Sequence, residues 1–94
     1  MTAAKEASHL LIKGRVQGVG YRFFVEETAL ALGLTGWVRN LPNGNVEIEV
    51  EGGRSAIEGW IEQLRRGPFM ARVTDIQVEW QPASGQYSSF EIRG

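Results

Sequence analysis

The sequence of 94 residues contains no cysteine, a single histidine, His9, and only three prolines. Without cysteine, this sequence can form neither disulfide bonds nor thiolate metal sites, and such a composition is typical of a reducing compartment. No apolar run approaches the roughly 20 residues that a membrane-spanning helix needs. The stretch Met1–Ala7 also lacks the apolar segment of a secretory signal. We therefore expect a cytoplasmic protein that does not enter a membrane.

An excess of charge of either sign is also missing, since ten Lys and Arg residues face eleven Asp and Glu residues, with a net charge of −1. Duplex nucleic acids and anionic membranes are recognised by basic patches, so we expect neither as a partner.

The carboxylates Glu47, Glu49 and Glu51 alternate along one stretch, which is typical of the solvated face of a strand. No Asp or His completes a ligand set around them, and we expect no metal and no cofactor.

The chain does carry a regular alternation of apolar and polar residues, which predicts one domain over residues 8–94 after a flexible tail of residues 1–7. Strands are expected over residues 8–13, 35–41, 45–51, 73–80 and 87–93, with helices over 23–32 and between Gly53 and Gly67. This β-α-β-β-α-β order with one further C-terminal strand predicts an α+β fold. It is the ferredoxin-like split β-α-β sandwich, an antiparallel sheet with both helices on one face.

The two helices are expected to turn apolar stripes toward the sheet. In the first helix the shared face comprises Phe24, Thr28, Ala31 and Leu32, with Val25 and Ala29 adjoining it. In the second helix the spacing i, i+3, i+4, i+7 is occupied by Ile57, Trp60, Ile61 and Leu64. The tryptophans Trp37, Trp60 and Trp80 all fall on core-type positions.

Glycines punctuate the stretch Gly14–Arg22, which joins the first expected strand to the first expected helix. Such a loop can turn backbone N–H groups inward, and the start of a helix adds unpaired N–H groups and a partial positive charge. The loop is not a Walker A motif, and Phe23 stands where a dinucleotide fingerprint needs its third glycine. The pattern leaves open a plain tight turn or a small anion pocket, and with Arg22 at the helix start it favours a pocket for a phosphoryl group.

Arg22 and Asn40 are the candidate side chains. An arginine in the first turn opposes the helix dipole unless an anion lies between the guanidinium and the backbone amides; the alternative is a surface charge paired with Glu26 four residues later. Asn40 stands near the end of a strand, where asparagine is uncommon. It either reaches into the same pocket or begins the turn at Pro42-Asn43-Gly44. The spacing alone leaves these alternatives open.

Two stretches resemble the signatures of a known family. Gly14-Arg-Val-Gln-Gly-Val-Gly-Tyr-Arg22 resembles the first signature of the acylphosphatases, and Gly36-Trp-Val-Arg-Asn40-Leu-Pro-Asn-Gly44 resembles the second. The resemblance extends from about Ser8 to Arg93. It implies the ferredoxin-like fold and a metal-independent hydrolase that converts acyl phosphates into a carboxylate and inorganic phosphate. Phosphate would then be both the product and a competitive ligand.

The resemblance also implies roles for individual residues. Arg22 corresponds to the catalytic arginine that binds the phosphate, and Asn40 to the catalytic asparagine that holds the attacking water. The implied phosphate-binding loop consists of the backbone N–H groups of Arg15, Val16, Gln17, Gly18, Val19, Gly20 and Tyr21. Some members follow the asparagine with a hydroxyl residue, whereas Leu41 follows here, and we expect a modest effect on rate.

Two other functions are compatible with the same fold. One is that of a carbamoyl-phosphate-processing relative, like the acylphosphatase-like domains of hydrogenase-maturation carbamoyltransferases, although the cysteine-rich zinc segments of such proteins are missing here. The other is a non-enzymatic ferredoxin-like module that binds phosphate or RNA on its open sheet face. The net charge and the acidic strand disfavour RNA. We expect a monomeric acylphosphatase.

Overall fold

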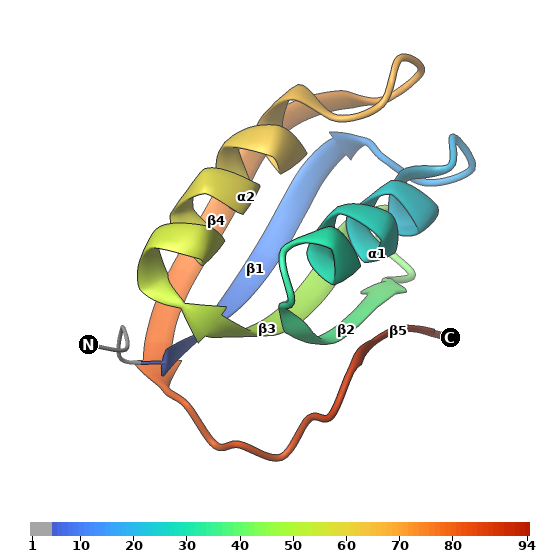
Figure 1. Cartoon of the computed structure of the whole chain (residues 1–94). Coiled ribbons are helices and arrows are strands. Elements are labelled where there is room, and N and C mark those ends of the chain that lie inside the picture. The colour runs from blue at the N-terminus through green and yellow to red at the C-terminus, as the bar shows by residue number, and fades with distance from the viewer. Residues whose placement is uncertain (1–4) are drawn as a thin grey trace.

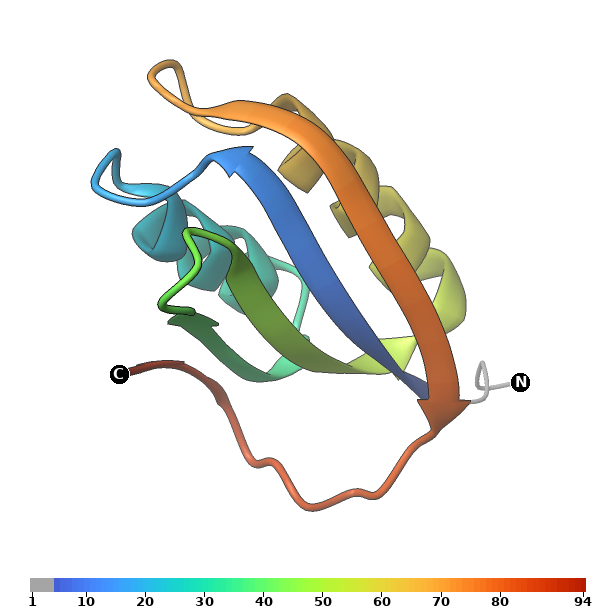
Figure 2. The same ribbon diagram turned by 180° about the vertical axis from the view of Figure 1, so that it is seen from behind.

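The computed structural model of the chain describes residues 5–94, which form an α+β sandwich (Figure 1). The elements follow in the order β1 (Lys5–Arg15), α1 (Tyr21–Ala31), β2 (Thr35–Asn40), β3 (Val46–Gly53), α2 (Arg54–Arg66), β4 (Arg72–Pro82) and β5 (Phe90–Arg93). The strands form one sheet in the order β4-β1-β3-β2-β5, and both helices cover the same face of it. No helix formed by residues 5–94 lies on the opposite face, as the view from behind shows (Figure 2). The predicted ferredoxin-like fold is confirmed.

The core between the sheet and the helices follows from the alternation in the sequence. Val46, Ile48 and Val50 of β3 are fully buried against the helices, because successive side chains of a strand point to opposite faces. The apolar stripe predicted for α2 is buried in full: Ile57, Trp60, Ile61 and Leu64. These contacts fix where α2 lies on the sheet.

The prediction of which face of α1 is buried is wrong, because the buried face is rotated about the helix axis from the predicted one. The residues that α1 buries are Tyr21, Val25 and Ala29, whereas Leu32 is 41% exposed. The helix begins at Tyr21, two residues earlier than expected, and its buried residues then recur at every fourth position. As a result Arg22 belongs to the first turn of the helix.

The last strand makes the sheet mixed, which differs from the predicted antiparallel sheet. β1, β2, β3 and β4 pair antiparallel, but β5 runs parallel to β2. β4 and β5 lie at opposite edges, and the segment between them crosses the end of the sheet (Figure 2). A chain that descends along β4 and crosses that end must ascend in β5, in the direction of β2. This crossing also shortens β5 to Phe90–Arg93.

The crossing segment is held by one buried carboxylate. Glu51 of β3, only 6% exposed, accepts hydrogen bonds from the hydroxyl and N–H of Ser84 (2.6 and 2.9 Å) and from the N–H of Gly85 (2.9 Å). Hydrogen bonds to an ionised acceptor are stronger than neutral ones. Glu51 therefore fixes the path that brings β5 back beside β2.

The first strand begins earlier than predicted. Lys5 and Ala7 pair with Gly53 and Glu51 of β3, because β3 continues to Gly53 and offers its backbone to residues 5–7. The predicted flexible tail of residues 1–7 is wrong for residues 5–7; its remaining positions, 1–4, lie outside the described residues.

The prediction that all three tryptophans occupy the core is wrong for Trp37. Trp60 is fully buried and meets Phe90 edge-on, with ring centroids 5.8 Å apart. Trp80 packs against the margin of the core beneath the guanidinium of Arg54. Trp37 alternates with the buried Val38 and therefore lies on the open face. The guanidinium groups of Arg39 and Arg93 lie over its ring, 5.2 and 5.3 Å from the centroid.

Candidate active site

The loop between β1 and α1 leaves several backbone donors free. Gly18 and Gly20 have φ values of 74° and 78°, a left-handed conformation that glycine adopts without penalty. Within residues 5–94, no backbone hydrogen bond outside the helices and strands is donated by residues 17–20. The first hydrogen bond of α1 runs from the N–H of Phe24 to the carbonyl of Gly20. The loop and the first helical turn thus present N–H groups that can bind an anion.

These donors border a small cavity of about 220 Å³ at the end of the sheet. Its lining residues come from the loop, α1, β2 and β5: Val16, Gly18, Gly20, Tyr21, Arg22, Phe23, Asn40 and Ile92. The structure therefore brings Arg22 and Asn40 to the same pocket. Of the residues predicted for the phosphate-binding loop, Arg15, Gln17 and Val19 do not line it. Arg15 is the last residue of β1 and pairs with Arg72.

Arg22 lies half-buried in the first turn of α1, at the wall of the cavity. The alternative of an ion pair with Glu26 is wrong, because none of the ion pairs within residues 5–94 includes Arg22. A guanidinium next to the positive end of a helix dipole is disfavoured by its neighbours. An anion in the cavity would offset that repulsion and accept hydrogen bonds from both.

Asn40 is the last residue of β2 and pairs with Val46 of β3. Its side chain does not start the following turn, since the side-chain acceptor within that turn is Oδ1 of Asn43, bonded by the N–H of Asn45 at 3.0 Å. Oδ1 of Asn40 is buried and has no hydrogen-bond partner among the described residues. A buried acceptor left without a donor costs about 1–3 kcal/mol, so this atom is suited to a donor that enters with the ligand.

Tyr21 is held as a structural phenol beside the loop. Its hydroxyl is buried and donates a 2.8 Å hydrogen bond to the carbonyl of Leu64 in α2. Burial raises the pKa of Tyr21 well above its ordinary value, because the phenolate would lose its hydration. The hydroxyl therefore stays protonated at physiological pH and does not serve as a base.

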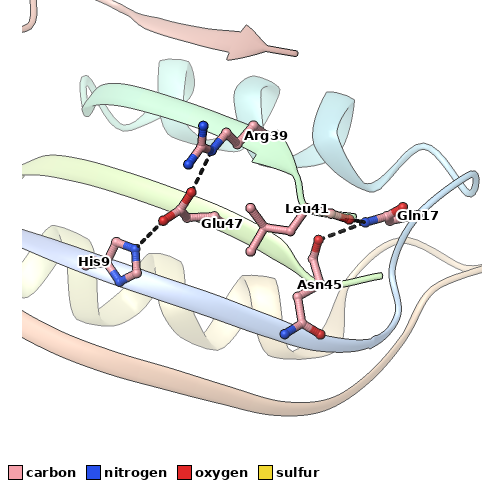
Figure 3. A network of polar contacts seen from close by, with 6 residues as sticks. All are labelled: His9, Gln17, Arg39, Leu41, Asn45 and Glu47. Carbon is pink, nitrogen blue, oxygen red and sulfur yellow. Dashed lines mark hydrogen bonds and ion pairs between the residues drawn. The ribbon is translucent and has the colours of Figure 1, made fainter. Parts of the chain in front are cut away.

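The carboxylate of Glu47 on the open face has two partners within the chain. Glu47 contacts Nε2 of His9 at 2.8 Å and accepts from Nε of Arg39 at 2.6 Å (Figure 3). Burial acts to raise the pKa of Glu47, but the hydrogen bonds from His9 and Arg39 outweigh it and hold that pKa below its usual range. Within residues 5–94, no three His, Asp or Glu side chains are arranged to hold a metal ion.

Three site features escaped the sequence-based prediction. Phe23 and Ile92 line the cavity with exposed fractions of 63% and 38%, and only the apolar character of Phe23 next to Arg22 gave a local signal. The side-chain amide of Gln17 donates to the carbonyls of Leu41 and Asn45, at 2.8 Å each (Figure 3). These partners lie 24 and 28 residues away in the sequence, so no local sequence pattern could have predicted the contact.

Known proteins resemble this chain in sequence and in fold. Residues 8–92 match the acylphosphatase family. An acylphosphatase from Thermus thermophilus is 49% identical over 75 residues, which cover 80% of this chain and 85% of that protein. The crystal structure of acylphosphatase from Bacillus subtilis matches with a TM-score of 0.92 at 36% identity, covering 95% of this chain and 99% of that one.

A further solved structure contains the same fold within a much longer protein. Full-length HypF in its phosphate- and nucleotide-bound form matches with a TM-score of 0.86 at 32% identity, over all of this chain but 12% of that one. The two acylphosphatases, in contrast, match over most of their own length. The chain thus belongs to the acylphosphatase family, enzymes that hydrolyse acyl phosphates to a carboxylate and inorganic phosphate.

Proposed function

We propose that Arg22 and the loop amides bind the phosphoryl group of the acyl phosphate, and that Asn40 holds the water that attacks it. One observation carries this assignment. Within residues 5–94, a guanidinium without an ion pair, backbone donors without an acceptor and a buried acceptor without a donor all border one cavity of about 220 Å³. The first two features suit a phosphoryl dianion. The third suits a water molecule, which can donate a hydrogen bond to the asparagine.

The phosphoryl oxygens are bound by two kinds of donor. The guanidinium of Arg22 can donate to two oxygens at once, which fixes their orientation. Free N–H groups of the loop and of the first turn of α1 donate to the remaining oxygens, with Gly18 and Gly20 supplying the backbone conformation that turns these groups inward. These donors are in place before the reaction and stabilise charge on the equatorial oxygens in the transition state.

The chemical step is a displacement at phosphorus. The water oxygen forms a bond to phosphorus, and the bond between phosphorus and the carboxyl oxygen breaks, with its electron pair leaving on the carboxylate. An amide is too weak a base to take the proton of the water, so Asn40 orients it, and the proton passes to a phosphoryl oxygen of the substrate. A carboxylate leaves without protonation, which explains why the site needs no general acid.

We further propose that the reaction requires no metal, because Arg22 and the amides already supply the positive charge that the phosphoryl group needs. The test is hydrolysis of benzoyl phosphate in a chelator, with inorganic phosphate as competitor. Full activity in the chelator and competitive inhibition by phosphate are expected. Activity that disappears with the chelator and returns with a divalent cation would overturn the metal-free mechanism.

We propose a monomer as the active form, because the fold of a single chain already brings Arg22, Asn40 and the loop to one cavity. Light scattering after gel filtration tests this, and a stable dimer at assay concentrations would contradict it.

Neither α1 nor α2 has the length and hydropathy needed to cross a membrane. We retain the cytoplasm as the proposed location, and fractionation of source cells tests it. The proposed ligands are acyl phosphates and inorganic phosphate, and neither nucleic acid nor a membrane is a proposed partner.

A further inference from the structure

The side chain of Gln17 does not line the cavity and points toward Leu41 and Asn45 (Figure 3). Its Nε2 donates to the carbonyl oxygens of Leu41 and Asn45, each at 2.8 Å. An amide nitrogen carries two hydrogens, and here both are used. Within residues 5–94, no other hydrogen bond joins loop residues 16–20 to residues 40–46.

The turn that accepts these bonds is already closed by its own backbone. The N–H of Leu41 donates to the carbonyl of Asn45 at 2.9 Å, and the N–H of Gly44 donates to the carbonyl of Leu41 at 3.2 Å. Both carbonyls therefore have partners inside the turn, and each uses its second lone pair for Gln17. The amide of Gln17 is not needed to close the turn; what it adds is a link between the turn and the loop.

That link joins the two elements that the proposed reaction must hold in register. The loop and α1 carry the phosphate donors and Arg22, while the end of β2 carries Asn40, and Leu41 follows Asn40 directly. Within residues 5–94, no hydrogen bond other than those of Gln17 holds this loop at a fixed distance from the end of β2. Displacement at phosphorus, however, needs the reacting atoms about 3–3.5 Å apart and aligned.

We propose that Gln17 is a positioning residue, whose amide fixes the distance between the phosphoryl group and the water held by Asn40. The inference rests on the proposed roles of Arg22 and Asn40. It assigns to the Gln17 side chain an effect on turnover that is separate from phosphate binding. Phosphate binding uses donors that all lie on the loop and α1, so they keep their mutual arrangement when the link is cut.

The test replaces Gln17 by methionine, which has a similar length but no donor. We expect kcat for benzoyl phosphate to fall by about tenfold to a hundredfold, the effect of a misplacement near 1 Å. The inhibition constant of inorganic phosphate is expected to change by less than about threefold. The control variant is Gln77→Met, an exposed glutamine of β4 outside the cavity, which should leave both quantities unchanged.

A double-mutant cycle with Asn40→Ala separates positioning from a general structural effect. If Gln17 acts through Asn40, Gln17→Met should lower kcat little further once Asn40 is absent, whereas independent effects would multiply. Gln17→Asn, which keeps the amide on a shorter stem, serves as a second variant in case the methionine variant fails to fold. It is expected to lower kcat in the same direction.

The outcomes separate this inference from the proposed function. Unchanged kcat in Gln17→Met, multiplicative losses in the cycle, or a phosphate inhibition constant that rises as much as kcat falls would each overturn the positioning role. Near-normal hydrolysis by Asn40→Ala alone would instead overturn the proposed role of Asn40. A loss of kcat confined to Gln17 and Asn40, at unchanged phosphate affinity, supports both.

Discussion

The hydroxyl of Tyr21 in the first turn of α1 donates to the carbonyl of Leu64 near the end of α2, at 2.8 Å. In a continuing α-helix that carbonyl would accept from the N–H four residues later. Position 68 is a proline, which has no N–H. Tyr21 thus supplies the donor that Pro68 lacks, and in doing so ties the turn that carries Arg22 to the second helix.

Replacing Tyr21 by phenylalanine should destabilise the fold by about 1–2 kcal/mol, because the buried carbonyl of Leu64 loses its partner. For a chain of this size we expect the melting temperature to fall by roughly 5–10 °C. Calorimetry or thermal unfolding followed by circular dichroism measures it. The matched control is Tyr87→Phe, since the Tyr87 hydroxyl has no hydrogen bond among the described residues. Equal melting temperatures for the two variants would contradict the assignment.

Replacing Arg22 by glutamine should lower kcat/KM for benzoyl phosphate by at least about a hundredfold, because the phosphoryl charge loses its fixed cation. Arg22→Lys should recover only part of the loss, since an ammonium cannot donate to two oxygens in the same plane. Stability should stay the same or rise slightly in Arg22→Gln, as a cation is removed from a helix N-terminus.

The control for Arg22 is Arg66→Gln, an exposed arginine in the last turn of α2 that does not line the cavity. It should keep normal turnover and lose a little stability, because there the cation complements the helix dipole. Normal hydrolysis by Arg22→Gln, or inhibition by inorganic phosphate as strong as in the wild type, would remove Arg22 from the phosphate site.

Replacing Asn40 by alanine should lower kcat by about two to three orders of magnitude, comparable to the loss of one positioned group. The inhibition constant of phosphate should hardly change, because Arg22 and the loop remain. The melting temperature should not fall, since the buried Oδ1 that lacks a partner is removed. Asn40→Asp should differ by also weakening phosphate binding through charge repulsion. A lower affinity for phosphate in Asn40→Ala would argue for a binding role instead.

The carboxyl of Glu51 predicts a pH dependence of stability. Burial acts to raise its pKa, but the hydrogen bonds from Ser84 and Gly85 outweigh burial and lower the pKa from its ordinary 4.5. A lowered pKa in the folded state adds stability above the unfolded pKa, and this stability is lost as the pH falls through the folded pKa. Glu51→Gln should therefore destabilise the protein by about 1–2 kcal/mol at pH 7, with a difference that shrinks below about pH 4.

Glu49, two residues earlier on β3, is the matched control, because its pKa is shifted in the opposite direction to that of Glu51. Burial is the main reason why the pKa of Glu49 is raised. The nearby His9 acts to lower this pKa, while the negative charges of Glu47 and Glu51 raise it further. A raised folded pKa disfavours the folded state once the pH exceeds the unfolded value. Glu49→Gln should therefore stabilise at pH 7 and have little effect at pH 3, as measured by urea unfolding at both values. The same sign for both variants at pH 7 would contradict these assignments.

Helices and strands could be predicted from the sequence where their buried residues recur at a regular spacing along the chain. Val46, Ile48 and Val50 alternate in β3, and the apolar spacing of α2 marks its buried face, because a strand and a helix repeat every 2.0 and 3.6 residues. The start of α1 was misplaced because Gly20 precedes it without a side-chain cap, so no N-cap residue marks the boundary. The parallel pairing of β5 depends on where the chain crosses the sheet, which no local pattern records.

The sequence by itself determined the strand-loop-helix unit, the candidates Arg22 and Asn40, and the family, since each lies in a short contiguous motif. Only the tertiary structure decided that Asn40 reaches the loop, that Arg22 stays clear of Glu26, and that Gln17 bridges to the far turn. The physical reason is distance along the chain: Gln17 and its acceptors lie 24 and 28 residues apart. Such contacts exist only after the register of β2 against β3 and the packing of α1 have placed both ends.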